Sequence, residues 1–194
     1  NQQSEIALLI LAPLICGMVV FLPIVISILY TSEFSLVVPM TRLLLIGSLI
    51  KAGSWAVSFL FLAAGDGKVY LLNEVGIKLF NLPLYLACYY FGGLLWVGYG
   101  FVLNYSVYFI WVTFVANKKY AFVHSRLFSK ILVINITLCV LSCLSVSVIL
   151  NIYLKYSLSI VVLLVSITYS FIELNKRIGL ESIINKIFTK NKKK

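Results

Sequence analysis

Six long apolar segments run almost end to end along this chain, and they restrict its fold more than any other feature. They cover residues 6–30, 36–64, 69–90, 94–115, 129–150 and 157–173. A helix needs about 20 residues to cross an apolar bilayer core of ~30 Å. The segments lack the strict alternation that is typical of membrane barrel strands. We therefore predict an all-α polytopic membrane protein, a bundle of six transmembrane helices.

Composition supports this prediction and excludes most soluble enzymes and nucleic-acid binders. Hydrophobic residues make up 62% of the chain and charged residues 11%, with a mean hydropathy of +1.06. Soluble domains are about 45–50% apolar and about 25% charged. We expect a transmembrane lobe over residues 1–174 and a basic cytoplasmic tail over 175–194. Apolar residues recur among the lysines of that tail, which indicates either an amphipathic helix on an anionic leaflet or a frayed solubilising tail.

The basic residues predict an orientation for the bundle. The connections between segments are short, so consecutive helices are expected to be antiparallel neighbours. With six spans, twelve basic residues fall on one side of the membrane and one, Lys155, on the other. The positive-inside rule then places both ends of the chain in the cytoplasm. The twelve are Lys68, Lys118, Lys119, Arg126, Lys130, Lys176, Arg177, Lys186, Lys190, Lys192, Lys193 and Lys194.

Residues with catalytic or metal-binding chemistry are few. The four cysteines lie in apolar runs without a metal-ligand spacing, so we expect them to be packing residues. The sequence has one histidine, His124, and no acid-rich motif that could hold Mg²⁺. We predict no cofactor, no metal and no enzymatic activity.

Lys51, near the middle of the second segment, is the most informative charged residue. A charge in a membrane span costs about 2.5–3.5 kcal/mol, so it needs an explanation. Lys51 shares a polar helical stripe with small and hydroxyl residues, among them Ser54 and Ser58, and its own span contains no acid. Such a stripe faces the bundle interior or a water-filled cavity.

The third segment carries a second polar face. Glu74 and Lys78 are spaced for an i,i+4 pair, and Asn73 lies beside them. Two interpretations stay open for this pair: it neutralises itself against a neighbouring helix, or it lines a functional cavity. Glu74 could also pair with Lys51 from the next helix.

Two further polar residues are candidates for the same cavity. Arg42 is nine positions before Lys51, half a turn away around an ideal helix, and it could instead extend to the outer membrane surface. Asn104 in the fourth segment lies deep enough to need a hydrogen-bond partner. A cation in a wet intramembrane cavity suggests an anionic ligand, and phosphate is a natural partner of lysine.

The order of residues between 13 and 78 resembles a known family. It is carried by Pro23, the segment Leu29-Tyr30-Thr31-Ser32-Glu33-Phe34, Pro39, Arg42, the stretch from Leu43 to Gly47, Leu49-Ile50-Lys51, Ser54-Trp55, Ala63-Ala64-Gly65, Lys68 and Asn73-Glu74. This pattern is similar to the C-terminal lobe of bacterial polysaccharide flippases of the O-antigen type. These flippases belong to the multidrug/oligosaccharidyl-lipid/polysaccharide exporter superfamily.

The resemblance implies a two-lobe transporter of twelve or more spans in the bacterial inner membrane, with this chain as one six-helix lobe. Its substrate would be undecaprenyl-diphosphate-linked oligosaccharide, and its partner would be an N-terminal lobe, a second copy of the chain or, more remotely, a polysaccharide polymerase or glycosyltransferase. Lys51 would hold the diphosphate, with weaker roles for Arg42 and Lys78. The alternatives are a cation-coupled exporter of the same superfamily and a non-transporting membrane subunit of a polysaccharide assembly complex.

Overall fold

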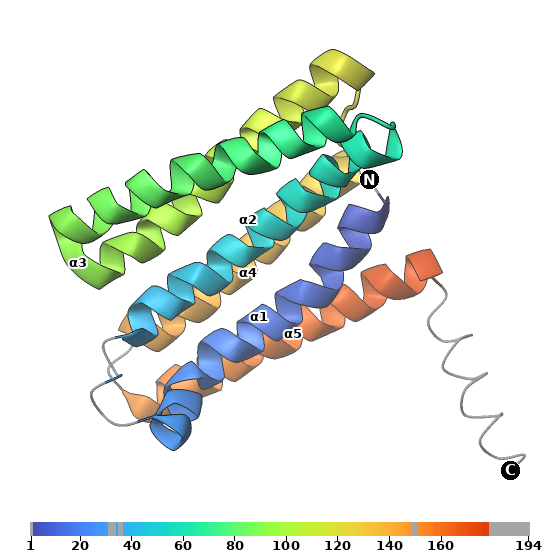
Figure 1. Ribbon diagram of the computed structural model, residues 1–194. Coiled ribbons are helices and arrows are strands. Elements are labelled where there is room, and N and C mark those ends of the chain that lie inside the picture. Colours follow the sequence, from blue (N-terminus) through green and yellow to red (C-terminus); the bar gives the residue numbers. More distant parts are fainter. Residues whose placement is uncertain (1, 31–33, 35–36, 149–150, 179–194) are drawn as a thin grey trace, which may run out of the picture.

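The computed structural model in Figure 1 describes residues 2–30, 34, 37–148 and 151–178. These residues form helices without any strand, which confirms the all-α prediction. Each helix is long and apolar enough to cross a membrane, and this indicates a membrane protein. The helices are α1 (Gln2–Leu29), α2 (Val37–Ala63), α3 (Gly67–Tyr120), α4 (Arg126–Val148) and α5 (Ile152–Ile178).

The described residues form five helices, so the prediction of six was wrong in number. The difference lies in α3, whose 54 residues would extend about 80 Å if the helix were straight. Only Gly93 leaves helical geometry, with φ 67° and ψ −156°, a conformation that is essentially restricted to glycine. At this residue α3 reverses into two limbs, 67–92 and 94–120, that lie side by side (Figure 1). The third and fourth apolar segments are therefore both present, but no loop separates them.

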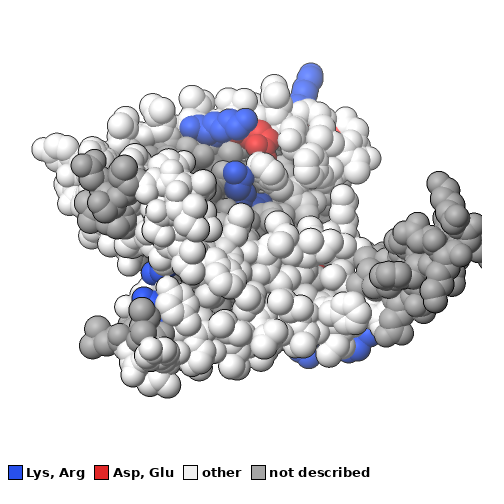
Figure 2. Space-filling model, turned by 90° about the horizontal axis from the view of Figure 1, so that it is seen from below, with Lys and Arg blue, Asp and Glu red and all other residues white. Residues whose placement is uncertain are grey.

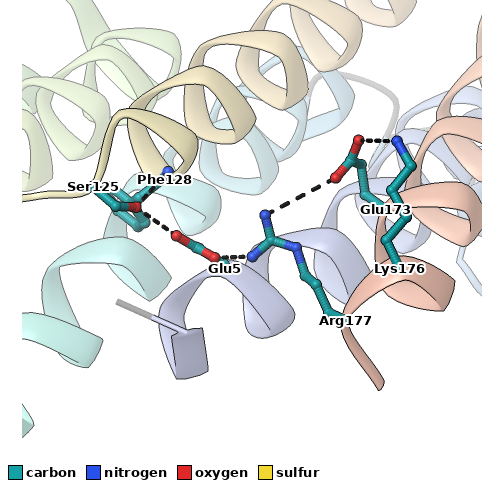
Figure 3. A network of polar contacts seen from close by, with 6 residues as sticks. All are labelled: Glu5, Ser125, Phe128, Glu173, Lys176 and Arg177. Atoms are coloured by element: carbon teal, nitrogen blue, oxygen red, sulfur yellow. Dashed lines mark hydrogen bonds and ion pairs between the residues drawn. The ribbon is translucent and has the colours of Figure 1, made fainter. Parts of the chain in front are cut away.

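One end of the bundle collects the start of α1, the α2–α3 and α3–α4 connections and the end of α5 (Figure 1). Ion pairs and hydrogen bonds join these parts. Lys119 pairs with Asp66 at 3.0 Å, and Glu5 contacts both Ser125 and Arg177 (Figure 3). This end carries the described basic residues that the orientation argument placed on one side, and we call it the lysine-rich end.

Helix α1 packs on α2, α4 and α5. Its buried side chains include Leu8, Leu9 and Cys16, which form the main core with residues of α2 and α4. The Sγ atoms of Cys16 and Cys139 lie 3.1 Å apart, and both residues are fully buried. All four cysteines are free thiols. For Cys16 and Cys139, the prediction of apolar packing residues is confirmed.

Glycines bring α2 and the second limb of α3 close together. A Cβ atom on Gly47 would lie 2.6 Å from the Phe101 ring, and one on Gly98 would lie 3.0 Å from the Leu43 side chain. Small residues permit such close approach between membrane helices. The polar stripe of α2 is thereby held directly against α3.

Helix α5 continues to Ile178, beyond the predicted segment 157–173. The rest of the predicted tail, residues 179–194, lies outside the described residues, as does most of the connection between α1 and α2.

Candidate binding cavity between α2 and α3

A cavity of about 210 Å³ lies between α2 and the first limb of α3. Helical spacing places residues 55, 58 and 59 of α2 on one wall and residues 70, 74 and 78 of α3 on the other. Polar and charged side chains from the two helices therefore meet in one space. We call this space the α2–α3 cavity, and it is lined by Trp55, Ser58, Phe59, Tyr70, Glu74 and Lys78.

Lys51 lies one helical turn before Trp55, beside this cavity. Its Nζ atom is 4.7 Å from the ring centroid of Trp55 and 5.2 Å from that of Tyr105. Aromatic faces attract an ammonium group without using its hydrogen-bond donors. Among the described residues Lys51 forms no ion pair, so its three N–H groups are available to a ligand.

Glu74 is held by hydroxyl groups and not by a lysine. Its Oε1 atom accepts hydrogen bonds from Tyr108 at 2.8 Å and from Ser58 at 3.4 Å. Neither the suggested Glu74–Lys78 pair nor a Glu74–Lys51 pair occurs within 4.0 Å among the described side chains. The exposed Lys78 therefore contributes a second unneutralised cation to the cavity.

Two predicted site residues lie close by but offer little to a ligand in this cavity. Asn73 points to the opposite side of its limb, where its Oδ1 accepts a hydrogen bond from Trp111 at 2.8 Å and its Nδ2 donates to the Val69 carbonyl. Ser54 is fully buried, and its hydroxyl donates to the Lys51 carbonyl at 2.7 Å.

Arg42 and Asn104 are placed elsewhere. Arg42 is buried and donates to the Ser147 hydroxyl of α4 at 3.2 Å, on the side of α2 away from Lys51. This placement agrees with the half-turn separation of Arg42 and Lys51 around α2. Arg42 neither shares a cavity with Lys51 nor extends to the membrane surface, so both of these suggested roles were wrong. Asn104 is fully buried, and neither of its polar atoms has a hydrogen-bond partner in the described part of the chain.

Aromatic residues of the second α3 limb complete the site, and their roles were not predicted from the sequence. Tyr105 supports Lys51 and Tyr108 holds Glu74. The three-residue spacing of Tyr105 and Tyr108 places both on one helix face and was the available signal, but a single segment does not reveal their partners on α2 and the first limb.

Charged side chains are sparse on the face of the molecule that is seen from below in Figure 2. Figure 2 shows a face that is mostly uncharged, with basic side chains gathered beside an acidic one in one region.

Outside the spans, Asp66 has a pKa below its usual range because Tyr120, and then Lys119, donate to its carboxylate. Burial lowers the pKa of His124, which stacks on Phe128 at 4.5 Å between ring centroids. At neutral pH His124 is therefore an uncharged packing residue.

Comparison with known proteins found no matching family model, no significantly similar curated protein and no significantly similar solved structure. The class that the fold defines is a helical membrane protein with a cationic cavity, and the flippase resemblance stays a prediction.

Proposed function

We propose that this chain forms one lobe of a transporter for undecaprenyl-diphosphate-linked oligosaccharide. One observation supports the proposal most strongly: Lys51 and Lys78 flank one cavity between membrane-spanning helices, without a carboxylate in ion-pair distance among the described residues. Two ammonium groups beside one carboxylate leave an excess of positive charge. A diphosphate has the complementary charge and accepts several hydrogen bonds at once.

In this proposal the lysine-rich end faces the cytoplasm of a bacterial cell, as the positive-inside rule predicts. The diphosphate enters the α2–α3 cavity while its lipid chain stays in the bilayer. An N-terminal lobe or a second copy of the chain supplies the opposite wall. Rocking of the two lobes would expose the diphosphate to each leaflet in turn.

Export of surface polysaccharide tests this proposal in cells that depend on the protein. Replacing Lys51 and Lys78 together with glutamine should reduce export at least about 10-fold, because each charged hydrogen bond is worth about 1.5–3 kcal/mol. Lys155→Gln is the matched control, since Lys155 lies at the opposite end of the bundle. Normal export by the double variant, at an unchanged amount of membrane-inserted protein, would contradict the proposal.

The cation-coupled exporter is the second candidate, because Glu74 is the acid of the α2–α3 cavity and has no basic partner in the described residues. A proton or metal cation would then bind at its carboxylate. Under this alternative, Glu74→Gln would abolish export of the transported substrate, whereas the double variant Lys51→Gln, Lys78→Gln would still export it. The diphosphate proposal predicts that the lysine variant loses export.

A further inference from the structure

A second and larger cavity, of about 530 Å³, lies between the two limbs of α3. Its volume is in the usual range of ligand pockets, about 300–1,000 Å³. Several wall residues also face the outside of the bundle, for example Leu72 at 72% exposed and Phe80 at 51%. The cavity is therefore open to the surroundings of α3. We call it the interlimb cavity, and it is lined by Val69, Leu72, Asn73, Gly76, Ile77, Phe80, Val107, Tyr108, Trp111 and Val115.

The walls of this cavity suit a hydrocarbon chain. Its polar groups already have partners: Trp111 donates to Asn73, and the Tyr108 hydroxyl donates to Glu74. The remaining wall is aliphatic or aromatic. A polar ligand group would lose its hydrogen bonds to water and would form few new ones with this wall. A bound water molecule would likewise lack the two to four hydrogen-bond partners that it needs.

Both walls continue toward exposed lysines at the lysine-rich end. Lys68 precedes Leu72 by four residues, and Lys118 and Lys119 follow Val115 by three and four residues. Residues at these spacings share one helix face. Lys119 pairs with Asp66, but Lys68 and Lys118 form no ion pair among the described residues. Uncompensated positive charge thus lies on the same helix faces that line an apolar cavity.

We propose that the interlimb cavity binds an anionic phospholipid, with an acyl chain between the α3 limbs and the phosphate at Lys68 and Lys118. Both parts of the ligand follow from the site: an apolar space for the chain and lysines beside it for the head group. Asn73 and Gly76 face this cavity, whereas Glu74 and Lys78 face the α2–α3 cavity. The phospholipid site is therefore separate from the proposed diphosphate site and goes beyond the proposed function.

Competitive lipid retention, measured by native mass spectrometry of the purified full chain, tests the proposal. The protein is exposed to mixed micelles with equal amounts of phosphatidylglycerol and phosphatidylcholine of the same chain length. We expect phosphatidylglycerol to be retained about 10- to 30-fold in excess, because the lysines attract its net negative head group, whereas the choline cation of phosphatidylcholine offsets the charge of the same phosphate. Equal retention of both lipids would overturn the proposal.

Three variants distinguish the two parts of the site. Lys68→Gln combined with Lys118→Gln should remove the preference for phosphatidylglycerol, while Lys155→Gln at the opposite end should keep it. Gly76→Phe should reduce retention of both lipids, because a side chain at Gly76 projects into open space and meets no atom within 4 Å. Thermal unfolding confirms that the Gly76→Phe variant is folded. If this variant retains both lipids as the wild type does, the placement of the acyl chain between the α3 limbs is contradicted. A changed oligomeric mass with unchanged lipid retention would show instead that protein covers the cavity.

Discussion

Replacing Glu5 with alanine is expected to lower the free energy of unfolding by about 3–5 kcal/mol. Glu5 is 5% exposed and joins three helices at the lysine-rich end (Figure 3). Its carboxylate pairs with Arg177 of α5 and accepts a hydrogen bond from Ser125 at 2.6 Å. Ser125 in turn accepts the Phe128 N–H at 2.9 Å and so caps the start of α4. The substitution leaves the guanidinium of Arg177, which is 12% exposed, with a single ion-pair contact among the described residues, to Glu173 at 4.0 Å.

Thermal and denaturant unfolding in detergent micelles measure this effect, and Lys176→Gln provides the control. The Lys176 side chain is 64% exposed and pairs with Glu173 at 3.1 Å, so its loss should cost less than about 1 kcal/mol. Equal stability of the Glu5 and Lys176 variants would show that the three-helix contact does not stabilise the bundle.

Gly47→Leu is expected to separate α2 from α3 and to lower the free energy of unfolding by about 1–3 kcal/mol or more. Even the Cβ atom would lie 2.6 Å from Cδ1 and 2.9 Å from Cε1 of Phe101. The Phe101 ring has little room to move, because Tyr105 lies at 4.7 Å and Tyr85 at 6.4 Å between ring centroids. The same displacement would move Tyr105 away from Lys51.

Gly76→Leu is the matched control for this substitution. The free energy of unfolding should fall in Gly47→Leu and should stay the same or rise in Gly76→Leu. Gly76 lies in the first limb of α3, and an added Cβ there meets nothing within 4 Å. Leucine is a better helix former than glycine by about 0.8–1 kcal/mol, so Gly76→Leu should keep or raise the unfolding temperature. If both variants unfold at the wild-type temperature, the close α2–α3 contact is contradicted.

Hydropathy predicted the helical membrane bundle because long apolar segments leave few alternatives in lipid. It also located the reversal of α3, since Gly92 and Gly93 interrupt an apolar stretch. It overestimated the number of helices, because Gly93 alone makes the turn and helical structure continues on both sides. A turn of one residue depends on the backbone angles of that residue, and hydropathy contains no information about these angles.

The candidate site was predicted in part. Helical spacing grouped Lys51 with Ser58 and Glu74 with Lys78, and the structure brings residues from both groups to one cavity or its edge. Spacing within a single helix does not identify partners on other helices. Arg42 therefore turned out to contact Ser147 of α4, Asn73 to contact Trp111, and Glu74 to accept bonds from hydroxyls. These contacts depend on how α2, α3 and α4 pack, which the sequence pattern alone did not specify.

The most direct test of the central claim is the affinity of the purified protein for undecaprenyl diphosphate in detergent micelles. We predict that undecaprenyl diphosphate binds more tightly than uncharged undecaprenol of the same chain length. The double variant Lys51→Gln, Lys78→Gln should bind the diphosphate about 10- to 100-fold more weakly than the wild type, and Lys155→Gln should bind it normally. Equal diphosphate affinity in the wild type and the double variant would contradict the assignment of the α2–α3 cavity as a diphosphate site.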